Sequence, residues 1–540
     1  MNRRAFLKTV AAAGAATATS VLPSRLRAAT AVADTEIVVH PQLAGVTISP
    51  QIYGHFIEHL GGVIYDGIWV GPDSKIPNVG GLRRQFIEDM KAIGAPNLRW
   101  PGGCFADGYH WRDGIGPAAK RPRTYNYWQR NTPEEVLGVE TNQFGTHEFM
   151  QLCKLVGAEP YLAGNVGSGT VKEFHDWVNY CNAAPGTLTL ADERAANGDK
   201  SPFNVNYWGV GNESWGCGGD MAPGEYAELY RQFVTQFPNQ GPSFLVATGP
   251  RGHSFDHDTG WTRGFFEAMQ GHKSRVDGFS LHFYTDFRQT NFKAAVFSPA
   301  EWYSVLLKGQ LMERAILDNW EIMTQLDPQH RTKFIVDEWG NWYPPGEEIA
   351  KGFTISQPIT LRDALHSALT FDIFNRHADK LAMANVAQTI NCLHSLFLAH
   401  GDNFIRTPVY YVFKLYQPHM GGRLVPMEIG GDPQNVTAVE GAAKMSLVYG
   451  SASVKDAGAL TVTLTNPSLD GPVTVRLRID GASATEVKGQ VLTHEDRQAA
   501  NTFAKPEVVA LAPLAAAVEG QTIRVTLPKQ SVVSLALRLS

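Results

Sequence analysis

The stretch Asn206-Tyr-Trp-Gly-Val-Gly-Asn-Glu-Ser-Trp215 is an apolar, β-rich run that ends abruptly at a carboxylate, Glu213. A second run of the same kind, Lys333-Phe-Ile-Val-Asp-Glu-Trp339, ends at Glu338. The end of a buried strand is a costly place for a carboxylate unless the group is paired or used. Taken alone, each glutamate could equally cap the following helix or pair with a nearby arginine, because perturbed carboxylates also occur in structural networks.

Outward from these two runs, short apolar strands alternate with amphipathic helices. The predicted strands are Ile52–Ile57, Asn97–Trp100, Glu159–Ala163, Asn204–Val210, Phe244–Thr248, Gly278–Phe283, Lys333–Asp337 and Lys380–Val386. The predicted helices are Leu82–Ile93, Thr146–Val156, Val171–Cys181, Gly224–Phe237, Trp261–Met269, Ser304–Gln325, Thr360–Asn375 and Asp402–Tyr416. Eight strand-then-helix units predict an α/β fold, a (β/α)8 TIM barrel. A doubly wound open sheet is the alternative, but no GxGxxG follows the first strand.

The sequence pattern changes after about Met420. Segments such as Ala459–Thr465, Val473–Ile479 and Gln521–Leu527 alternate apolar and polar residues, and turn-rich gaps separate them. This alternation predicts a C-terminal antiparallel β-sandwich domain. Thr35–His40, ahead of the barrel, has the same pattern and could join that sheet. The expected organisation is therefore N-terminal strands in 34–49, the barrel in 50–418 and the sandwich in 419–540.

Residues 1–33 have the composition of a targeting segment. The pair Arg3-Arg4 is followed by Phe-Leu-Lys, a mildly apolar stretch over Thr9–Leu22 and a small-residue site at Ala31–Ala33. This order is typical of a twin-arginine signal peptide, and the apolar stretch is too short and too rich in Gly and Thr for a membrane span. The expected location is therefore periplasmic or secreted. A cytoplasmic protein with a disordered start is the alternative.

Composition narrows the class of protein further. The chain has 540 residues, of which 44% are hydrophobic and 18% charged, as in soluble proteins of more than one domain. The net charge of −5 is slight, so the composition does not indicate a protein that binds nucleic acid or an anionic membrane. Five cysteines, an odd number without CxxC or metal-ligand spacing, leave at least one unpaired and allow no pair to be assigned.

In a parallel barrel, chemistry takes place at the C-terminal ends of the strands. Six of the eight predicted strands end in side chains that can hydrogen-bond a polyhydroxylated ligand or exchange a proton. These side chains include Glu58, Cys104, Asn212, Glu213, His282, Tyr284, Glu338, Trp339, Trp342 and Gln388. Glu213 and Glu338, on strands four and seven, should face each other across the barrel mouth. Hydrolysis of a glycosidic bond needs such a pair, about 5–5.5 Å apart for retention and about 6.5–9.5 Å apart for inversion.

Four motifs together resemble glycoside hydrolase family 51, whose characteristic members are α-L-arabinofuranosidases. They are Tyr53-Gly-His-Phe-Ile-Glu-His59, Leu98-Arg-Trp-Pro-Gly-Gly103, Trp208-Gly-Val-Gly-Asn-Glu213 and Val336-Asp-Glu-Trp339. The resemblance runs from about Ile37 to the C-terminus. Asn-Glu at the end of strand four is shared by a whole clan of retaining barrel glycosidases. The strand-one glutamate and the Arg-Trp-Pro-Gly-Gly loop narrow the resemblance to the family.

The resemblance implies a role for each site residue. Glu213 would be the general acid/base and Glu338 the nucleophile. Asn212 would hold the 2-hydroxyl of the sugar, and Tyr284 would donate a hydrogen bond that positions Glu338. Glu58, His282 and Gln388 would bind sugar hydroxyls or orient the two glutamates. Trp339 and Trp342 would contact the sugar ring or the aglycone.

One position departs from the family pattern. Gly-Gly-Asn is common after the second strand, whereas this chain has Gly102-Gly103-Cys104, with a cysteine in place of the asparagine. Cysteine cannot offer the paired donor and acceptor of an amide, so Cys104 would bind the sugar weakly or a backbone group would take over. An exported thiol beside a catalytic centre would also be open to oxidation.

The expected function is that of an exported, exo-acting α-L-arabinofuranosidase. It would release terminal non-reducing residues from arabinose-containing oligosaccharides or polysaccharides with retention and without a cofactor. The alternatives are an endo-acting glucanase or xylanase with the same machinery and a non-catalytic carbohydrate-binding protein, which would not need both glutamates. A metal site is not expected, because His55 and His59 lie at a strand end and no HExxH is present. A homo-oligomer is expected by family analogy alone.

Overall fold

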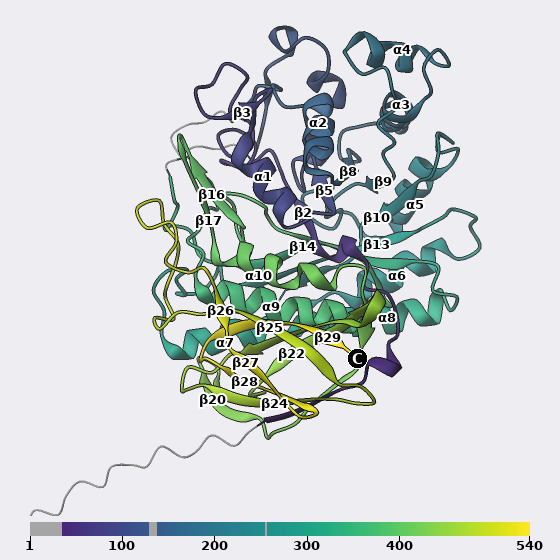
Figure 1. The fold of residues 1–540 in the computed structure, drawn as a ribbon. Coiled ribbons are helices and arrows are strands. Elements are labelled where there is room, and N and C mark those ends of the chain that lie inside the picture. The colour runs from purple at the N-terminus through teal and green to yellow at the C-terminus, as the bar shows by residue number, and fades with distance from the viewer. Residues whose placement is uncertain (1–34, 129–137, 254–255, 351) are drawn as a thin grey trace, which may run out of the picture.

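The computed structural model describes residues 35–128, 138–253, 256–350 and 352–540. The predicted signal peptide, residues 1–33, lies outside the described residues. Figure 1 shows a barrel surrounded by helices in the upper part of the molecule and a layered β-domain beneath it. In the part of the chain that is described, no helix is both long and apolar enough to cross a membrane.

The barrel consists of eight parallel strands. In chain order they are β2 (Gly54–Phe56), β5 (Asn97–Trp100), β8 (Glu159–Gly164), β9 (Tyr207–Val210), β10 (Phe244–Ala247), β13 (Gly278–Asp286), β14 (Lys333–Trp342) and β15 (Leu381–Val386). Each strand pairs in parallel with the next, and β15 pairs with β2 to close the ring. The predicted closed barrel is confirmed, and the open doubly wound sheet is excluded.

Helices follow the strands and cover the outside of the barrel (Figure 1). They are α1 (Arg84–Ala92), α2 (Thr146–Val156), α3 (Val171–Asn182), α4 (Thr189–Ala196), α5 (Pro223–Val234), α6 (Thr259–Met269), α7 (Pro299–Gly309), α8 (Leu311–Leu326), α9 (Leu361–Arg376) and α10 (Pro408–Tyr416). Local sequence sets several of their ends. The Ser298 hydroxyl accepts from the Glu301 backbone N–H and so caps α7, and Gly157 ends α2 in the left-handed conformation.

Two helix predictions were wrong in detail. The helix expected over 304–325 is two helices, α7 and α8, which meet at Gln310. The helix expected over 402–416 starts only at Pro408, because Asn403–Arg406 forms β17 in a hairpin with β16 (Phe397–His400). Proline suits the first turn of a helix, where its missing N–H has no partner to lose. Helix α4 was not predicted.

The β-domain consists of two sheets. One has the strand order β19-β1-β24-β28-β27 and the other β18-β22-β23-β29-β25-β26. These strands are β1 (Thr35–Val39), β18 (Arg423–Val425), β19 (Met427–Ile429), β22 (Tyr449–Lys455), β23 (Ala459–Asn466), β24 (Val473–Ile479), β25 (Ala484–Leu492), β26 (Leu511–Leu514), β27 (Ala516–Glu519), β28 (Thr522–Leu527) and β29 (Ser531–Leu539). Apolar side chains from both sheets form a core separate from that of the barrel. The predicted sandwich is therefore present.

Strand β1 belongs to the sandwich although it precedes the barrel in sequence. It pairs in parallel with β24 and antiparallel with β19. Three pairs of strands form short ribbons: β3 (Asn78–Val79) with β4 (Leu82–Arg83), β6 (Thr124–Tyr125) with β7 (Val139–Glu140), and β20 (Gln434–Ala438) with β21 (Gly441–Met445). Strand β11 (Arg251–His253) pairs with β12 (Asp256–His257) and, in parallel, with the second half of β13, so both extend the barrel sheet.

The sandwich packs against helices of the barrel through buried polar contacts. On α9, Asp372 Oδ1 accepts hydrogen bonds from Ser451 Oγ of β22 at 2.7 Å and from Tyr416 Oη of α10 at 2.9 Å. Trp302 Nε1 of α7 donates to the Pro467 carbonyl at 3.0 Å. These contacts fix the sandwich to helices on the outside of the barrel.

Candidate active site

Glu338 lies on β14 and both of its carboxylate oxygens accept hydrogen bonds. Arg99 Nη1 donates to Oε1 at 2.8 Å, and Tyr284 Oη donates to Oε2 at 2.7 Å. Burial by itself would raise the pKa of Glu338, but the charges of His282 and Arg99 and these hydrogen bonds outweigh burial and lower it. Glu338 is therefore held as a carboxylate in a buried setting, the state that a nucleophile needs.

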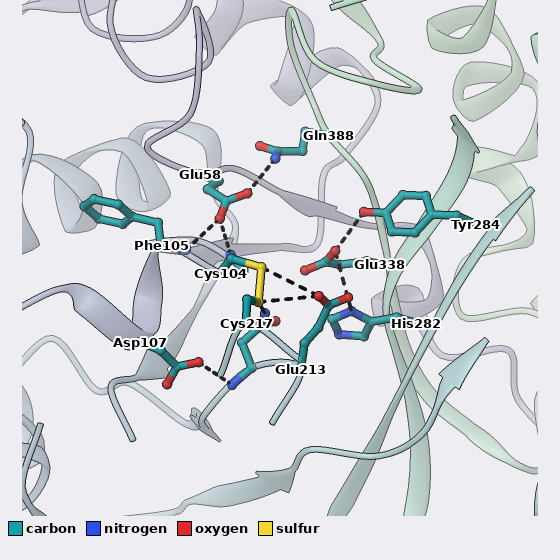
Figure 2. Close-up of a disulfide and its surroundings, with 12 residues drawn as sticks. Glu58, Cys104, Phe105, Asp107, Glu213, Cys217, His282, Tyr284, Glu338 and Gln388 are labelled. Atoms are coloured by element: carbon teal, nitrogen blue, oxygen red, sulfur yellow. Dashed lines mark hydrogen bonds and ion pairs between the residues drawn. A yellow bond between two sulfur atoms is a disulfide. The ribbon is translucent and has the colours of Figure 1, made fainter. Parts of the chain in front are cut away.

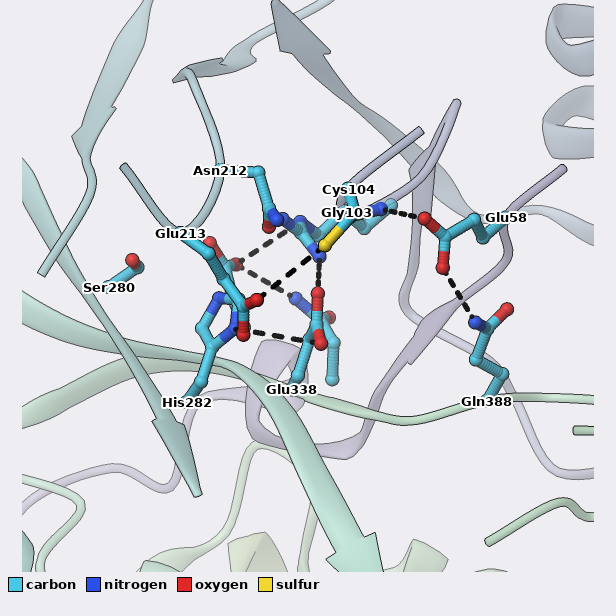
Figure 3. A network of polar contacts seen from close by, with 12 residues as sticks. Glu58, Gly103, Cys104, Asn212, Glu213, Ser280, His282, Glu338 and Gln388 are labelled. Carbon is cyan, nitrogen blue, oxygen red and sulfur yellow. Dashed lines mark hydrogen bonds and ion pairs between the residues drawn. The ribbon is translucent and has the colours of Figure 1, made fainter. Parts of the chain in front are cut away.

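Glu213 follows β9 and faces Glu338 across His282 (Figure 3). His282 Nδ1 lies 2.9 Å from Glu213 Oε1 and 3.5 Å from Glu338 Oε2. Burial would lower the pKa of His282, but the two glutamates raise it above its ordinary value. One oxygen of each glutamate and the histidine nitrogen all lie within 4.8 Å of one another. Three such groups are close enough together to hold a metal ion. The hydrogen bonds from Arg99 and Tyr284 to Glu338 suit a free carboxylate that acts as a nucleophile.

The backbone of Glu213 is in an unusual conformation. Its φ is +42°, in the left-handed region that a glutamate rarely adopts. Residues in such conformations persist when their surroundings hold them and are common at active sites. The Glu213 carbonyl accepts from the backbone N–H groups of Gly216 at 2.7 Å and Gly218 at 3.1 Å. The segment that follows Glu213 therefore folds back and fixes it.

Arg99, on β5, binds both Glu338 and Asn212, the residue before Glu213. Its Nη2 donates to Asn212 Oδ1 at 2.6 Å while Nη1 holds Glu338, and its Nε lies 3.8 Å from Asp337 Oδ1. The acceptor oxygen of Asn212 is thus engaged by Arg99, and its Nδ2 amide lies 3.8 Å from Cys217 Sγ. Arg99 is almost fully buried, so this network is set before any ligand binds.

Glu58 and Gln388 form a second polar group at the mouth. Glu58 Oε1 accepts from the backbone N–H groups of Gly103 and Phe105, both at 3.0 Å, and Oε2 accepts from Gln388 Nε2 at 2.9 Å. Burial, and then the charge of Glu338, raises the pKa of Glu58 to about 7. Gln388 Oε1 is buried and has no partner among the described residues, so it remains an acceptor for a ligand hydroxyl.

Two glycines let the loop after β5 pass close to both glutamates. A Cβ at Gly102 would lie 2.6 Å from Glu58 Cγ, and a Cβ at Gly103 would lie 2.6 Å from Glu338 Oε1. No other residue type fits these approaches without a shift of the loop or of the carboxylates. The Pro-Gly-Gly sequence is therefore a packing requirement of this site.

A cavity of about 350 Å³ opens above these groups. It is lined by Glu58, Leu60, Cys104, Tyr127, Trp128, Glu213, Tyr284, Arg288, Glu338, Trp342, Thr354, Ile355, Gln388 and Leu393. The Trp342 ring meets the Tyr284 ring edge-on, and the Arg288 guanidinium lies 3.9 Å from the Trp342 ring centroid. Trp339 is not at this cavity. Its side chain is buried and packs against Phe371 and Phe374 of α9.

Cys104 is not a free thiol, so the expectation of an oxidisable thiol at this position was wrong. It forms a disulfide with Cys217, 113 residues away (Figure 2). The free cysteines among the described residues are Cys153, Cys181 and Cys392, all of them buried. Any contact of the Cys104 side chain with the sugar is therefore made by a disulfide sulfur, which cannot donate a hydrogen bond.

Three residues of the site were not among the sequence candidates: Arg99, Asp107 and Cys217. Asp107 Oδ1 accepts from the Val166 backbone N–H at 2.9 Å, and Oδ2 accepts from that of Asn212 at 3.2 Å. Signals for all three were present. Arg99 is a charged residue inside the four-residue strand β5, Asp107 lies in the loop after it, and Cys217 stands four residues after Glu213 in a Gly-rich turn.

An eight-stranded parallel barrel with two facing glutamates at the ends of its fourth and seventh strands defines a glycoside hydrolase. The α-L-arabinofuranosidase 1 domain model matches residues 89–297, and the α-L-arabinofuranosidase C-terminal domain model matches residues 337–531. An intracellular exo-α-L-arabinofuranosidase of Bacteroides ovatus is 38% identical over 93% of this chain and 95% of its own length. The chain belongs to the α-L-arabinofuranosidases of glycoside hydrolase family 51.

Solved structures agree with this assignment. The GH51 arabinofuranosidase from Xanthomonas axonopodis pv. citri is 38% identical, with a TM-score of 0.86 over 94% of this chain and 100% of that one. The α-L-arabinofuranosidase from Thermotoga maritima, solved as an arabinose complex, is 29% identical, with a TM-score of 0.79 over 93% of this chain and 99% of that one.

The comparisons also correct one prediction. A periplasmic or secreted location was expected, but the Bacteroides ovatus relative is named an intracellular enzyme. Secretion is therefore not supported for this chain. The twin-arginine pattern on which that prediction rested lies outside the described residues.

Proposed function

We propose that this protein removes terminal non-reducing α-L-arabinofuranosyl residues from arabinose-containing oligosaccharides or polysaccharides with retention of configuration. The observation that carries the proposal is the pair Glu213 and Glu338, which have one carboxylate oxygen each within 4.8 Å of the other and of His282. Oxygens this close agree with the carboxyl separation of about 5–5.5 Å in retaining enzymes, whereas inverting enzymes hold their carboxyl groups roughly 6.5–9.5 Å apart to make room for a water.

The reaction would proceed in two displacements. Glu338, ionised and held by Arg99 and Tyr284, attacks the anomeric carbon while Glu213 gives its proton to the departing glycosidic oxygen. This first step leaves arabinose covalently bound to Glu338. In the second step Glu213, now a carboxylate, takes a proton from a water that attacks the same carbon and releases the sugar. His282, between the two glutamates, keeps them oriented toward one anomeric centre.

The dimensions of the cavity support exo action. Its volume of about 350 Å³ is at the lower end of the roughly 300–1,000 Å³ typical of ligand sites, which suits a single pentose better than an extended polysaccharide. Gln388 Oε1 and Asn212 Nδ2 offer an acceptor and a donor for its hydroxyls. The name of the Bacteroides ovatus relative, an exo-α-L-arabinofuranosidase, points the same way.

The decisive experiment compares 4-nitrophenyl α-L-arabinofuranoside with the corresponding β-glucoside and β-xyloside. We expect hydrolysis of the furanoside, and Glu338→Ala to lower kcat by about 10⁴-fold or more, because loss of a nucleophile removes the covalent route. Azide should rescue this variant and give a glycosyl azide of inverted configuration. Furanoside hydrolysis that survives Glu338→Ala would contradict the nucleophile assignment.

The products formed from arabinan or arabinoxylan separate the alternatives. Exo action releases arabinose alone from the start of the reaction. Internal fragments would favour an endo-acting glucanase or xylanase. Binding without any hydrolysis would favour a non-catalytic carbohydrate-binding protein.

A further inference from the structure

The Cys104–Cys217 disulfide joins two loops of the barrel mouth. Cys104 follows Gly103 in the loop after β5, and Cys217 stands in the loop after β9, four residues beyond Glu213. The loop after β5 holds Glu58 through the backbone N–H groups of Gly103 and Phe105. The bond therefore connects the segment that holds Glu58 to the segment that carries Glu213.

Both sulfur atoms lie against the Glu213 carboxylate (Figure 2). Cys104 Sγ is 3.6 Å and Cys217 Sγ is 3.5 Å from Glu213 Oε2. A disulfide sulfur carries no hydrogen, so these are packing contacts and not hydrogen bonds. His282 occupies the other side, 2.9 Å from Oε1. The carboxylate is thus confined between an imidazole and a disulfide, although 18% of its side chain is open to solvent.

The loop that carries Cys217 is also packed tightly onto the backbone near Glu213. A Cβ at Gly218 would lie 1.9 Å from the Asn212 carbonyl oxygen and 2.8 Å from Asp107 Oδ2. The same loop donates the two backbone hydrogen bonds that hold the Glu213 carbonyl. Because Glu213 has a sparsely populated φ of +42°, its conformation depends on this loop staying in place. The disulfide is the covalent anchor of the loop.

We propose that the Cys104–Cys217 disulfide is a positioning element for the proton donor Glu213, so that proton donation to the leaving group is efficient only while the bond is intact. The proposal rests on the function proposed above, in which Glu213 is the general acid/base. Reduction by a dithiol transfers two electrons and two protons to the protein: the S–S bond breaks, each cysteine becomes a thiol, and the dithiol becomes a disulfide. The two loops are then free to separate, and the carboxylate loses the wall on one side.

Small reductants can reach this bond, and it is the one disulfide among the described residues. Cys217 is exposed and Cys104 is half-buried, whereas Cys153, Cys181 and Cys392 are buried. A disulfide that only stabilised the fold could lie anywhere between two loops. This one touches the group that must donate a proton, and that position gives a kinetic signature that a purely structural cross-link lacks.

The test uses the full chain and three substrates: the 2,4-dinitrophenyl, 4-nitrophenyl and phenyl α-L-arabinofuranosides. Dinitrophenolate departs without a proton, whereas phenolate needs one, and kcat/KM reports only the steps through first bond cleavage. After reduction with dithiothreitol, with thiols counted by mass spectrometry, we expect kcat/KM to fall about tenfold or more for the phenyl glycoside and less than about twofold for the dinitrophenyl glycoside. Reoxidation with oxidised glutathione should restore it.

Variants separate the disulfide from the other thiols. Cys217→Ser should reproduce the behaviour of the reduced enzyme and no longer respond to dithiothreitol. Cys153→Ala, which removes a buried thiol of α2, should keep the wild-type response. If Cys217→Ser does not fold, the reduced wild-type protein still gives the answer.

Two outcomes would overturn the proposal: an equal loss on all three substrates, which marks a structural cross-link, or no loss after complete reduction. Glu213→Ala is the reference, because it should show the strongest dependence on the leaving group. If Glu213→Ala lacks that dependence, the general-acid assignment fails. If Glu213→Ala shows it and the reduced enzyme does not, only the role of the disulfide fails.

Discussion

At the scale of single residues, carboxylates outnumber cations around the cavity, and their neighbours decide which of them is ionised. Glu338 is held by Arg99 and lies beside His282, which together keep its pKa below the usual range. Burial raises the pKa of Glu58 and of Asp107 to about 7 each, although both accept backbone hydrogen bonds. The position of Arg99 and His282 therefore selects Glu338 as the carboxylate that stays charged in acid.

Tyr284→Phe tests how Glu338, the proposed nucleophile, is held. The variant loses a hydrogen bond to a charged group, worth about 1.5–3 kcal/mol, so kcat/KM should fall about 10–100-fold. The Tyr284 bond favours the ionised form of Glu338 and lowers its pKa. Without it the carboxylate takes up a proton at higher pH, so the acid limb of the pH profile of kcat/KM should move upward.

Tyr230→Phe is the matched control, because the Tyr230 hydroxyl donates to the Arg275 carbonyl at 2.7 Å, away from the cavity. It should leave the pH profile of kcat/KM unchanged. An acid limb in Tyr284→Phe at or below the wild-type position would contradict the account given for Glu338.

The site also marks where residue-level prediction succeeded and failed. Side chains at strand ends could be found from the strand pattern, because all strands of a parallel barrel end on the same side. Trp339 was misplaced because successive residues of a strand point to opposite faces, so a strand that turns Glu338 toward the mouth turns Trp339 toward the helices. The Cys104–Cys217 pair could not be found, because sequence alone does not fix disulfide connectivity.

At the scale of elements, the loop after β5 carries much of the site. It supplies the two close glycines, a cysteine of the disulfide, the amides that hold Glu58, and Asp107. Its 3-10 helix, Ala106–Gly108, turns Asp107 toward the backbone of Asn212. One short segment thus sets the position of both glutamate-bearing strand ends.

Gly103→Ala tests this arrangement. The added Cβ would lie 2.6 Å from Glu338 Oε1, so either the loop or the Glu338 carboxylate must move. A displacement of about 1 Å at a catalytic centre can cost about 100-fold in rate, and we expect a loss of that order in kcat for the 4-nitrophenyl furanoside. Gly108→Ala, in the same loop with nothing within 4 Å of its Cβ, should stay within about twofold of wild type. Wild-type kcat in Gly103→Ala would refute the packing requirement.

Elements were predicted well where the apolar pattern and the boundary signals agree. Strand β5 and helix α2 have the predicted bounds, and Gly157 supplies the stop for α2. The break between α7 and α8 was missed because helical spacing of apolar residues continues on both sides of Gln310. The β16–β17 hairpin was missed because β17 is only four residues long and adjoins a true helix.

At the scale of the whole molecule, a buried carboxylate lies where barrel and sandwich meet. Burial raises the pKa of Asp372 from 3.8 to about 7, in spite of the hydrogen bonds from Ser451 and Tyr416. Because the folded protein holds this proton more tightly than the unfolded chain, stability should fall as pH rises from about 4 to about 7. A shift of about three pKa units corresponds to roughly 4 kcal/mol.

Asp372→Asn removes this ionisation while keeping a side-chain oxygen that can accept from Ser451 and Tyr416. We expect the unfolding temperature of the wild type to drop more between pH 5 and pH 8 than that of Asp372→Asn, as measured by calorimetry. Asp432→Asn, at an exposed carboxylate in the loop between β19 and β20, serves as the control. Parallel pH profiles for wild type and Asp372→Asn would show that Asp372 carries no such penalty.

Strand β1 has a consequence for how the chain is made. Val38 pairs with Glu428, 428 − 38 = 390 residues later, so β1 leaves the ribosome long before any of its sandwich partners exist. At about 5–20 residues per second, it waits about 20–80 s while the barrel segment is synthesised. During that time a largely apolar strand has both edges unpaired, the condition under which nascent chains associate wrongly. Shielding of Thr35–Val39, by a chaperone or by the growing barrel, should therefore raise the yield of folded enzyme.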